Sequence, residues 1–353
     1  MAPGPSTPRP HINAIGTAVP AQDIHAAFVD WARARLPATE AKLFDRMAAR
    51  AGIAHRWSVL TDPPVAPGGF YATEPHPGTG DRMARYAAAA PELALAAIAD
   101  LAARRPVDGI THLVVASCTG FVAPGIDQRI AAALALSPGV ERTLIGFMGC
   151  YAAVAALRTA RHIVRSEPAA RVLVVTVELS TLHLQAEDRL EPLLAMLQFG
   201  DGAAAALVTA DADGLAIGRP FATTLPASEA LIRWDVTDRG FAMHLSGEVP
   251  GRIATALKDP ALVAAITGGR VPDAWAVHAG GRSILDAVAG ALDLPADALD
   301  DSRAVLAANG NMSSATLMFV LARLLERPAP DHGIALAFGP GLAAEGFAFG
   351  RSA

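Results

Sequence analysis

The chain contains two cysteines, Cys118 and Cys150, and the position of Cys150 suits a nucleophile. Gly149-Cys150 precedes small and apolar residues that continue to about Val164, a pattern that predicts a helix beginning at Cys150. Unpaired amides and the helix dipole favour an anion at such an end, so we expect the pKa of the thiol to fall and thiolate to be available near neutral pH. The alternative is that Cys150 is a small buried hydrophobic residue, as most free cysteines are.

A histidine and an asparagine occupy comparable positions later in the chain. His278 follows a short apolar strand, Ala274 to Val277, so its side chain is expected at the carboxyl edge of a sheet, where α/β folds bind ligands. Asn311 opens a further small-residue helix, where an amide either caps the helix or donates to a thioester oxygen. Because cysteine proteases also use Cys, His and Asn, the residue types alone do not define the reaction.

The elements that must position these residues follow an α/β pattern. A helix is predicted from about Glu40 to Leu60, a Pro- and Gly-rich loop from Asp62 to Gly80, and an alanine-rich helix from about Asp81 to Arg104. From Thr111 onward, apolar strands alternate with apolar-faced helices, which is typical of a layered α/β fold.

Two stretches of the sequence match each other. The strand, turn and helix around Cys118 correspond to those around His278, and the glycine, polar residue and helix at Cys150 correspond to those at Asn311. Cys118 and Cys150 are 32 positions apart, and His278 and Asn311 are 33 apart. An internal duplication is the economical explanation, and chance matching of alanine-rich strings is the alternative.

Composition excludes several classes of function. The 353 residues are 52% hydrophobic and 18% charged with a net charge of -5, and basic residues do not cluster, so nucleic-acid binding is not expected. Residues 1–10 lack an apolar run of signal-peptide length, and no stretch approaches the roughly 20 apolar residues that span a bilayer, which together predict a cytoplasmic protein without a transmembrane segment. No histidine has metal-ligand spacing with a thiol or carboxylate, so no metal is expected.

Five motifs occur in a fixed order between residues 44 and 349: Gly149-Cys-Tyr-Ala152, Phe199-Gly-Asp-Gly-Ala203, His278-Ala-Gly-Gly281, Gly310-Asn-Met-Ser-Ser-Ala315 and Phe338-Gly-Pro-Gly341. Together they resemble the motifs of chalcone synthase and its bacterial relatives, the type III polyketide synthases. The resemblance implies a thiolase-like αβαβα five-layered sandwich formed by two pseudo-duplicated halves and paired as a homodimer. We divide the chain into residues 1–215, which carry the nucleophilic cysteine, and residues 216–353, which carry the histidine and asparagine.

The resemblance also implies an acyltransferase mechanism that needs no cofactor, because CoA thioesters are the substrates. Cys150, held as a thiolate by the imidazolium of His278, would accept an acyl starter from acyl-CoA. The thioester oxygen of malonyl-CoA would accept hydrogen bonds from His278 and Asn311 while CO2 departs. Each round would add two carbons, and cyclisation would follow.

Substrate-binding positions are carried over from the same family. Arg46 and Arg50 match two of three basic residues that hold the CoA phosphates, with Leu43 at the third position; a solvated helix face is the alternative for both arginines. Ser283 matches a backbone contact to the pantetheine arm. The remaining pocket residues implied by the resemblance are Phe199, Met243, Cys118, Trp234, Ser180, Phe338 and Gly339.

Several of these pocket residues depart from the plant enzymes. Met243 replaces a second gatekeeper phenylalanine beside Phe199, Cys118 replaces a threonine, and Trp234 replaces a glycine. The departures argue against a chalcone-type product. The Cys118-Thr-Gly-Phe121 turn and the Ser-Thr-Leu-His-Leu stretch from Ser180 to Leu184 resemble those of bacterial relatives that make alkylresorcinols or alkylpyrones, so a product of that type is expected.

Three other functions share parts of this pattern. A β-ketoacyl-ACP synthase III would use the same three residue types for a single condensation with malonyl-ACP. A cysteine hydrolase would release free acid from acyl-CoA without malonate. A non-catalytic scaffold with a thiolase fold would keep the architecture without the chemistry.

Overall fold

The computed structural model of the chain describes residues 8–61, 65, 68–72 and 76–351, so the first seven residues and parts of the predicted 62–80 loop lie outside the described residues. Nine strands form one sheet in the order β11-β12-β13-β8-β1-β7-β6-β4-β5. Their bounds are β1 (His11–Ala18), β4 (His112–Ser117), β5 (Glu141–Gly146), β6 (Val172–Leu179), β7 (Asp201–Thr209), β8 (Leu215–Thr224), β11 (Ala274–Val277), β12 (Gly333–Gly339) and β13 (Ala343–Gly350).

The sheet consists of two arms with the same pairing pattern. In one arm β4 pairs parallel with β6, and β6–β7 and β7–β1 are antiparallel; in the other, β11 pairs parallel with β12, and β12–β13 and β13–β8 are antiparallel. The arms join where His11 of β1 lies opposite Ala216 of β8. This repetition is what an internal duplication predicts.

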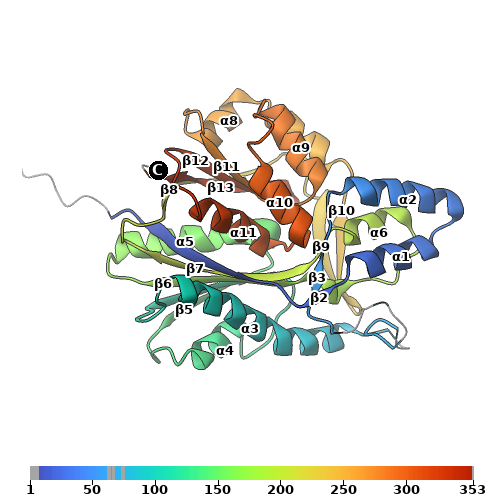
Figure 1. Ribbon diagram of the computed structural model, residues 1–353, viewed down its shortest axis with the longest axis horizontal. Helices are drawn as coiled ribbons and strands as arrows, with labels where there is room; N and C mark the ends of the chain where they lie inside the picture. The colour runs from blue at the N-terminus through green and yellow to red at the C-terminus, as the bar shows by residue number, and fades with distance from the viewer. Residues whose placement is uncertain (1–7, 62–64, 66–67, 73–75, 352–353) are drawn as a thin grey trace, which may run out of the picture.

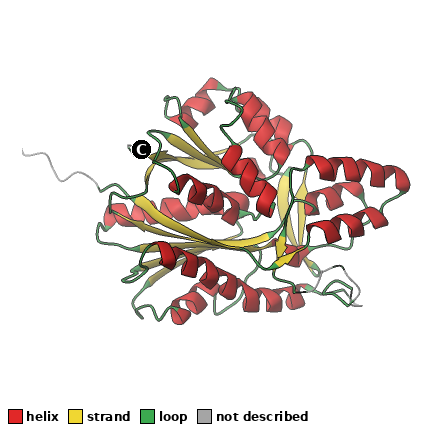
Figure 2. Cartoon of the chain, in the orientation of Figure 1, coloured by secondary structure: helices red, strands yellow, loops and turns green. Residues whose placement is uncertain are grey.

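Helices cover and separate the two arms in five layers (Figure 1). One outer layer contains α3 (Thr79–Arg104) and α4 (Ile126–Ala133), the middle layer contains α5 (Ala152–Ser166) and α11 (Ser314–Leu325), and the other outer layer contains α8 (Pro260–Thr267), α9 (Arg282–Ala291) and α10 (Asp300–Asn309). Figure 2 shows the same alternation of helices and strands by secondary structure. The expected αβαβα sandwich is confirmed.

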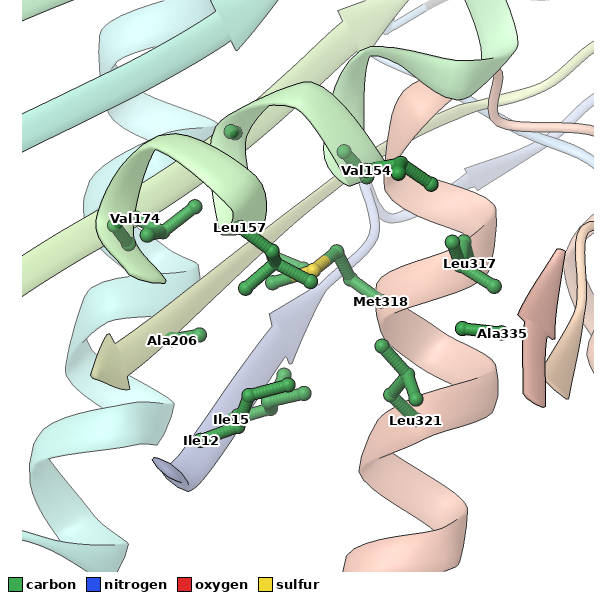
Figure 3. Packing of buried hydrophobic residues seen from close by; sticks show 14 of the residues in the cluster. Ile12, Ile15, Val154, Leu157, Val174, Ala206, Leu317, Met318, Leu321 and Ala335 are labelled. Atoms are coloured by element: carbon green, nitrogen blue, oxygen red, sulfur yellow. The ribbon is translucent and has the colours of Figure 1, made fainter. Parts of the chain in front are cut away.

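Small residues allow the middle helices to fit between the two arms. Ala152, Ala153 and Ala156 of α5 are fully buried, and α11 contributes Leu317 and Met318 to the same core cluster (Figure 3). Alanine side chains bring a helix close to a sheet without overpacking, while the larger residues fill the remaining volume. The middle layer is therefore rigid, and it is this layer that carries the segments following Cys150 and Asn311.

A smaller group of elements lies beside the sandwich (Figure 1). Phe28, Phe44 and Leu193 form the apolar contact among three of its helices. The group comprises α1 (His25–Arg35), α2 (Ala38–Arg50), α6 (Leu190–Met196), the pair β2 (Gln22–Asp23) and β3 (Trp57–Ser58), and the pair β9 (Ile232–Thr237) and β10 (Gly240–Leu245). The remaining helix, α7 (Val249–Ala256), packs against α9 of the outer layer.

The helix predicted to reach Leu60 ends at Arg50. Beyond it, the backbone N–H groups of Ala54 and His55 donate to the carbonyl of Ala307, at 2.8 and 3.1 Å. These tertiary bonds replace the next intrahelical ones, and the chain continues into β3. Sequence periodicity could not reveal that end, because the competing acceptor lies about 250 residues away in the chain.

Among the described helices, α3 has the length and mean hydropathy of a helix that could cross a bilayer, but Arg85, Glu92 and Asp100 interrupt it, so it is no uninterrupted apolar run. One face of α3 is buried against the sheet through Tyr86, Ala90, Ala94 and Ala97. The helix therefore packs as a core helix of the sandwich.

Candidate active site

Cys150, His278 and Asn311 line one cavity of about 620 Å³. Cys150 lies in a 3-10 turn, Gly149–Tyr151, directly before α5, while His278 follows β11 and Asn311 follows α10. Cys150 and His278 are 128 residues apart in the chain, His278 and Asn311 are 33 apart, and the two sheet arms bring the three side chains together.

Close packing fixes the turn that carries Cys150. Gly149 has a φ of 75°, and a Cβ atom there would lie 2.3 Å from Cδ of Pro340. Its backbone N–H donates to Sγ of Cys118 at 2.9 Å. Cys118 is buried behind the turn, and Gly339 packs against the backbone of Cys150, so both expected pocket residues lie behind Cys150 and line neither its cavity nor the one that adjoins it.

The expected low pKa of Cys150 is contradicted by its surroundings. Burial raises the pKa of the thiol to about 12, although hydrogen bonds with Ser313 and Asn311 act in the opposite direction. Burial also lowers the pKa of His278 to about 3. A helix end stabilises an anion by at most about 2 kcal/mol, and here the loss of water on burial outweighs that effect. Burial therefore favours the neutral thiol over the thiolate and the neutral imidazole over the imidazolium.

The imidazole of His278 is open toward a ligand. Neither of its ring nitrogens has a hydrogen-bond partner among the described residues, although the side chain is buried. The backbone is held firmly, because the N–H of His278 donates to the carbonyl of Leu336 at 2.8 Å. Buried polar atoms without partners are uncommon, and here they leave donor and acceptor capacity facing the cavity.

The amide of Asn311 is oriented by its own neighbours. Its Nδ2 donates to the carbonyl of Gly280 at 3.2 Å, and its Oδ1 accepts from the backbone N–H of Ser313 at 2.8 Å. These two bonds fix which end of the amide is the donor, and the amide also lies within hydrogen-bond reach of the Cys150 thiol. Asn311 is thus a pre-oriented donor.

Glu178, which the sequence analysis did not single out, lies behind the same site. Its carboxylate accepts from the backbone N–H of Cys118 and Oγ1 of Thr119, each at 2.9 Å, and from Oγ of Ser314. Burial raises the pKa of Glu178 to about 7. A glutamate in the otherwise apolar stretch of β6 is the signal that could have identified it.

A second cavity, of about 350 Å³, adjoins the first. Phe199 and Met243 line both cavities and form part of the wall between them. Trp234 and Ser180 line the second, and the ring of Trp234 lies 6.4 Å from that of Phe199. The two expected gate residues therefore stand between the cavity that Cys150 lines and a second chamber, which both apolar and charged side chains line.

Candidate CoA-binding residues lie near the mouth of the first cavity. Ser283 and Phe338 line it, whereas Arg46 and Arg50 lie on the exposed face of α2. Arg282, which the sequence analysis did not select, donates from Nη1 to the backbone carbonyl of Arg50 at 3.4 Å. The sequence could have indicated Arg282, because it stands between Gly281, the last residue of the His278-Ala-Gly-Gly281 motif, and Ser283, a candidate CoA-binding residue.

Among the described residues, no group of three or more His, Cys, Asp or Glu side chains is placed to hold a metal ion.

Two sequence profiles cover most of the chain. The profile of the chalcone and stilbene synthases, N-terminal domain, matches residues 5–212, and the profile of their C-terminal domain matches residues 219–351. The bisdemethoxycurcumin synthase of Oryza sativa subsp. japonica is 35% identical over 325 residues, which cover 85% of this chain and 80% of that protein.

Solved structures of similar proteins agree. The C-terminal type III polyketide synthase domain of Steely1, a type I/III hybrid from Dictyostelium, matches with a TM-score of 0.89 and 25% identity, covering 97% of this chain and 99% of that one. PKS-I from the brown alga Ectocarpus siliculosus matches with a TM-score of 0.86 and 28% identity, covering 99% and 100%. With both profiles matched and the fold shared over its whole length, the chain belongs to the chalcone and stilbene synthase family and is a type III polyketide synthase, an acyltransferase.

Proposed function

We propose that Cys150 is the nucleophile of an iterative decarboxylative condensation, that His278 and Asn311 bind the reacting thioester, and that the substrates are an acyl-CoA starter and malonyl-CoA. The observation that carries the proposal is the cavity lined by all three side chains, in which neither ring nitrogen of His278 has a hydrogen-bond partner within the described part of the chain.

Starter loading begins from the neutral pair. His278 takes the proton of Cys150 as the sulfur attacks the acyl carbonyl of acyl-CoA. The bond between that carbon and the CoA sulfur breaks, and His278 returns the proton to the departing CoA thiolate. The imidazole is then neutral again and retains one N–H donor.

Extension uses the same donors. The bond between C2 of malonyl-CoA and its carboxylate breaks, CO2 leaves, and the electron pair forms an enolate whose oxygen accepts from His278 and Asn311. C2 then attacks the thioester carbonyl on Cys150, a C–C bond forms, and the C–S bond to Cys150 breaks. The extended chain is left on CoA, and the Cys150 thiolate takes up one proton from water. Only the CoA thioesters are consumed, so we propose no further cofactor.

The wall between the two cavities supports a proposal about the product. Phe199 and Met243 separate the catalytic cavity from the chamber that Trp234 lines. We propose that this chamber receives the apolar part of the starter and growing chain, with an alkylresorcinol or alkylpyrone type of product, as in bacterial members of the family. Arg46, Arg50 and Ser283 are proposed to hold CoA at the mouth.

A homodimer is proposed from the outer edge of the sheet. β5 is the terminal strand, and its residues are largely exposed. Leu144 of β5 is 50% exposed, and Phe121 and Phe147 near it are 52% and 47% exposed. An unpaired apolar strand edge is a template for another chain, and a second copy would cover it.

Two further proposals concern the whole chain. Its halves are divided between residues 215 and 216, at the start of β8. The reaction is placed in the cytoplasm, where Cys118 and Cys150, both free in this structure, would stay reduced.

A panel of starters tests the proposed function. The protein is incubated with malonyl-CoA and short, aromatic and long-chain acyl-CoAs, and products are identified by mass. Products carrying two or more malonate-derived units on a long-chain starter are expected. A strict requirement for malonyl-ACP with a single condensation would instead indicate a β-ketoacyl-ACP synthase III, and free acid formed without malonate would indicate a hydrolase.

A further inference from the structure

Arg56 is a buried arginine that the reaction scheme does not use. It is 1% exposed, its Cζ lies 4.5 Å from the ring centre of Phe28, and its Nε donates to Nδ1 of His25 at 3.1 Å. Burial lowers the pKa of His25 to about 4, which keeps that imidazole neutral and able to accept. Burying a cation is costly, so its contacts should explain why it is there.

The guanidinium binds the turn that precedes a gate residue. Nη1 of Arg56 donates to the carbonyl oxygens of Met196 and Phe199, at 3.0 and 2.9 Å. Met196 is the last residue of α6, where helix carbonyls lack intrahelical partners. One charged donor therefore holds both ends of the 196–199 turn, and a cation is favoured at that helix end.

The same turn is joined to Asn311 through the backbone. Phe199 and Asn311 form an isolated parallel bridge: the N–H of Asn311 donates to the carbonyl of Gln198 at 2.7 Å, and the N–H of Gly200 donates to the carbonyl of Asn311 at 3.0 Å. A shift of the Phe199 backbone would therefore be passed to Asn311.

Arg56 also packs directly beneath this bridge. A Cβ atom at Gly310, whose φ is 68°, would lie 2.9 Å from Cγ of Arg56 and 2.7 Å from the carbonyl oxygen of Gln198. The stem of Arg56 thus occupies the space under the residue that precedes Asn311, while its head binds the turn on the other side. Arg56 therefore contacts both the 196–199 turn and the backbone of Gly310, and it fixes the position of one relative to the other.

We propose that Arg56 is a positioning residue, which sets the backbone of Phe199 and Asn311 so that the amide of Asn311 meets the thioester oxygen of malonyl-CoA. The proposal rests on the role assigned to Asn311 above. Cys150 lies on a different segment, so loading of the starter depends less on Arg56 than decarboxylation does.

The test measures two rates on the full-length protein: acylation of Cys150 by acyl-CoA and decarboxylation of malonyl-CoA. Arg56→Met keeps the apolar stem and removes the donors, and kcat for decarboxylation should fall about 10- to 100-fold, since small displacements of a catalytic group have effects of this size. The acylation rate and the KM for malonyl-CoA should change less than about threefold. Arg56→Lys can still reach one carbonyl, so its kcat for decarboxylation should lie between those of the parent and Arg56→Met. If Arg56→Met does not fold, the same two rates are compared between Arg56→Lys and the parent.

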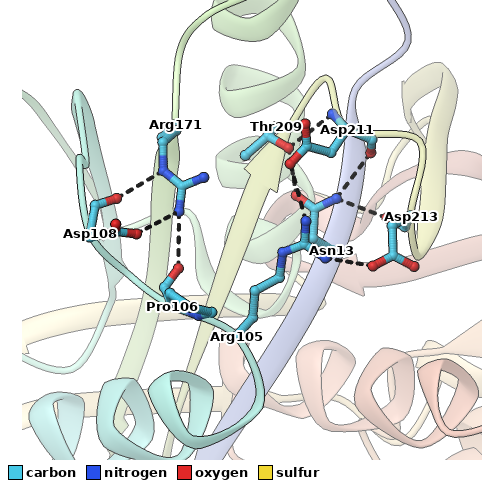
Figure 4. Close-up of polar contacts among 8 residues, drawn as sticks. All are labelled: Asn13, Arg105, Pro106, Asp108, Arg171, Thr209, Asp211 and Asp213. Carbon is cyan, nitrogen blue, oxygen red and sulfur yellow. Dashed lines mark hydrogen bonds and ion pairs between the residues drawn. The ribbon is translucent and has the colours of Figure 1, made fainter.

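Arg171→Met is the matched control. Arg171 also donates to loop carbonyls, those of Pro106 and Asp108, at 3.0 and 2.8 Å (Figure 4). That loop precedes β4, at the opposite end of the strand from Cys118 and roughly 20 Å along it. Arg171→Met should lower thermal stability without changing the ratio of decarboxylation to acylation.

A double-mutant comparison separates the two proposals. In an Asn311→Ala background, Arg56→Lys should cause little further loss, because Arg56 acts through Asn311. If Asn311→Ala itself leaves decarboxylation unchanged, the proposed function of Asn311 is wrong. Two results would reject the positioning role of Arg56. In the first, Asn311→Ala lowers the decarboxylation rate, yet Arg56→Lys added to it lowers the rate by its full further factor. In the second, Arg56→Lys alone lowers the acylation rate as much as the decarboxylation rate.

Discussion

Gly149 donates its backbone N–H to Sγ of Cys118 at 2.9 Å, so the thiol of Cys118 supports the turn that carries Cys150. The N–H is buried, and the Cys118 side chain is its acceptor. Cys118→Ala should therefore destabilise the protein by about 1–3 kcal/mol, the cost of an unpaired buried donor. Cys118→Ser, which retains an acceptor, should lose less. Urea unfolding of both variants checks this, and equal losses would show that the bond contributes nothing.

Cys150→Ala should abolish chain extension while leaving slow decarboxylation of malonyl-CoA. The thiol is lost, but His278 and Asn311 still line the cavity and can bind the thioester oxygen. Radiolabelled malonyl-CoA follows both reactions, with Cys118→Ser as the matched loss of the other thiol. Extension at the normal rate by Cys150→Ala would disprove the assignment of the nucleophile.

The neutral state of the pair predicts how alkylation depends on pH. Because burial raises the pKa of Cys150 to about 12, the thiolate fraction should increase about tenfold per pH unit between about pH 6 and 9. Iodoacetamide inactivation, measured in the Cys118→Ser variant so that one thiol reacts, should rise throughout this range. A plateau beginning near pH 6 would instead indicate a preformed thiolate and imidazolium.

Glu178 should make stability fall as pH rises. Burial raises its pKa from 4.5 to about 7, and burial likewise raises that of Asp201 from 3.8 to about 7. The folded protein therefore holds protons that the unfolded chain releases, and the stabilisation present below about pH 4.5 is lost as pH approaches about 7. The free energy of unfolding, measured with urea between about pH 4.5 and 7, should fall roughly half as steeply with pH in Glu178→Gln as in the parent. The remaining pH dependence would be due to Asp201. An unchanged slope would show that Glu178 is ionised in the folded protein.

Trp234 should limit the starter. Its indole lines the second cavity beside Phe199, so Trp234→Gly enlarges the chamber and should raise kcat/KM for bulky starters about tenfold relative to short ones. Trp234→Phe should have an intermediate effect. Mass spectrometry of the products compares the three proteins, and an identical starter range and product length in all of them would remove Trp234 from the specificity determinants.

The sequence predicted the layered fold because apolar strands and helices alternate from Thr111 onward, and the structure confirms it. It also selected Cys150, His278 and Asn311, since few residue types perform such chemistry and their motifs are distinctive. The end of α2 at Arg50 was missed, because hydrogen bonds to a distant carbonyl decide it.

Properties that depend on burial in the folded chain, such as the pKa of Cys150, also could not be predicted from the sequence. The pKa of Cys150 was expected to fall with its place at a helix end, but the surrounding segments remove water and raise it. Arg56 and Glu178 were not selected as site residues for the same reason: only the folded chain shows that one binds the turn before Phe199 and the other lies behind Cys118. Burial of a charged residue is a tertiary property that periodicity does not encode.

The bridge between Phe199 and Asn311 runs entirely through main-chain atoms. Mutation can therefore change the size of the side chain at position 199, and with it the space available to a growing chain, without altering the hydrogen bonds that hold the backbone of Asn311. In an enzyme built this way, new products can arise by substitutions at the gate while the machinery for carbon–carbon bond formation is inherited intact.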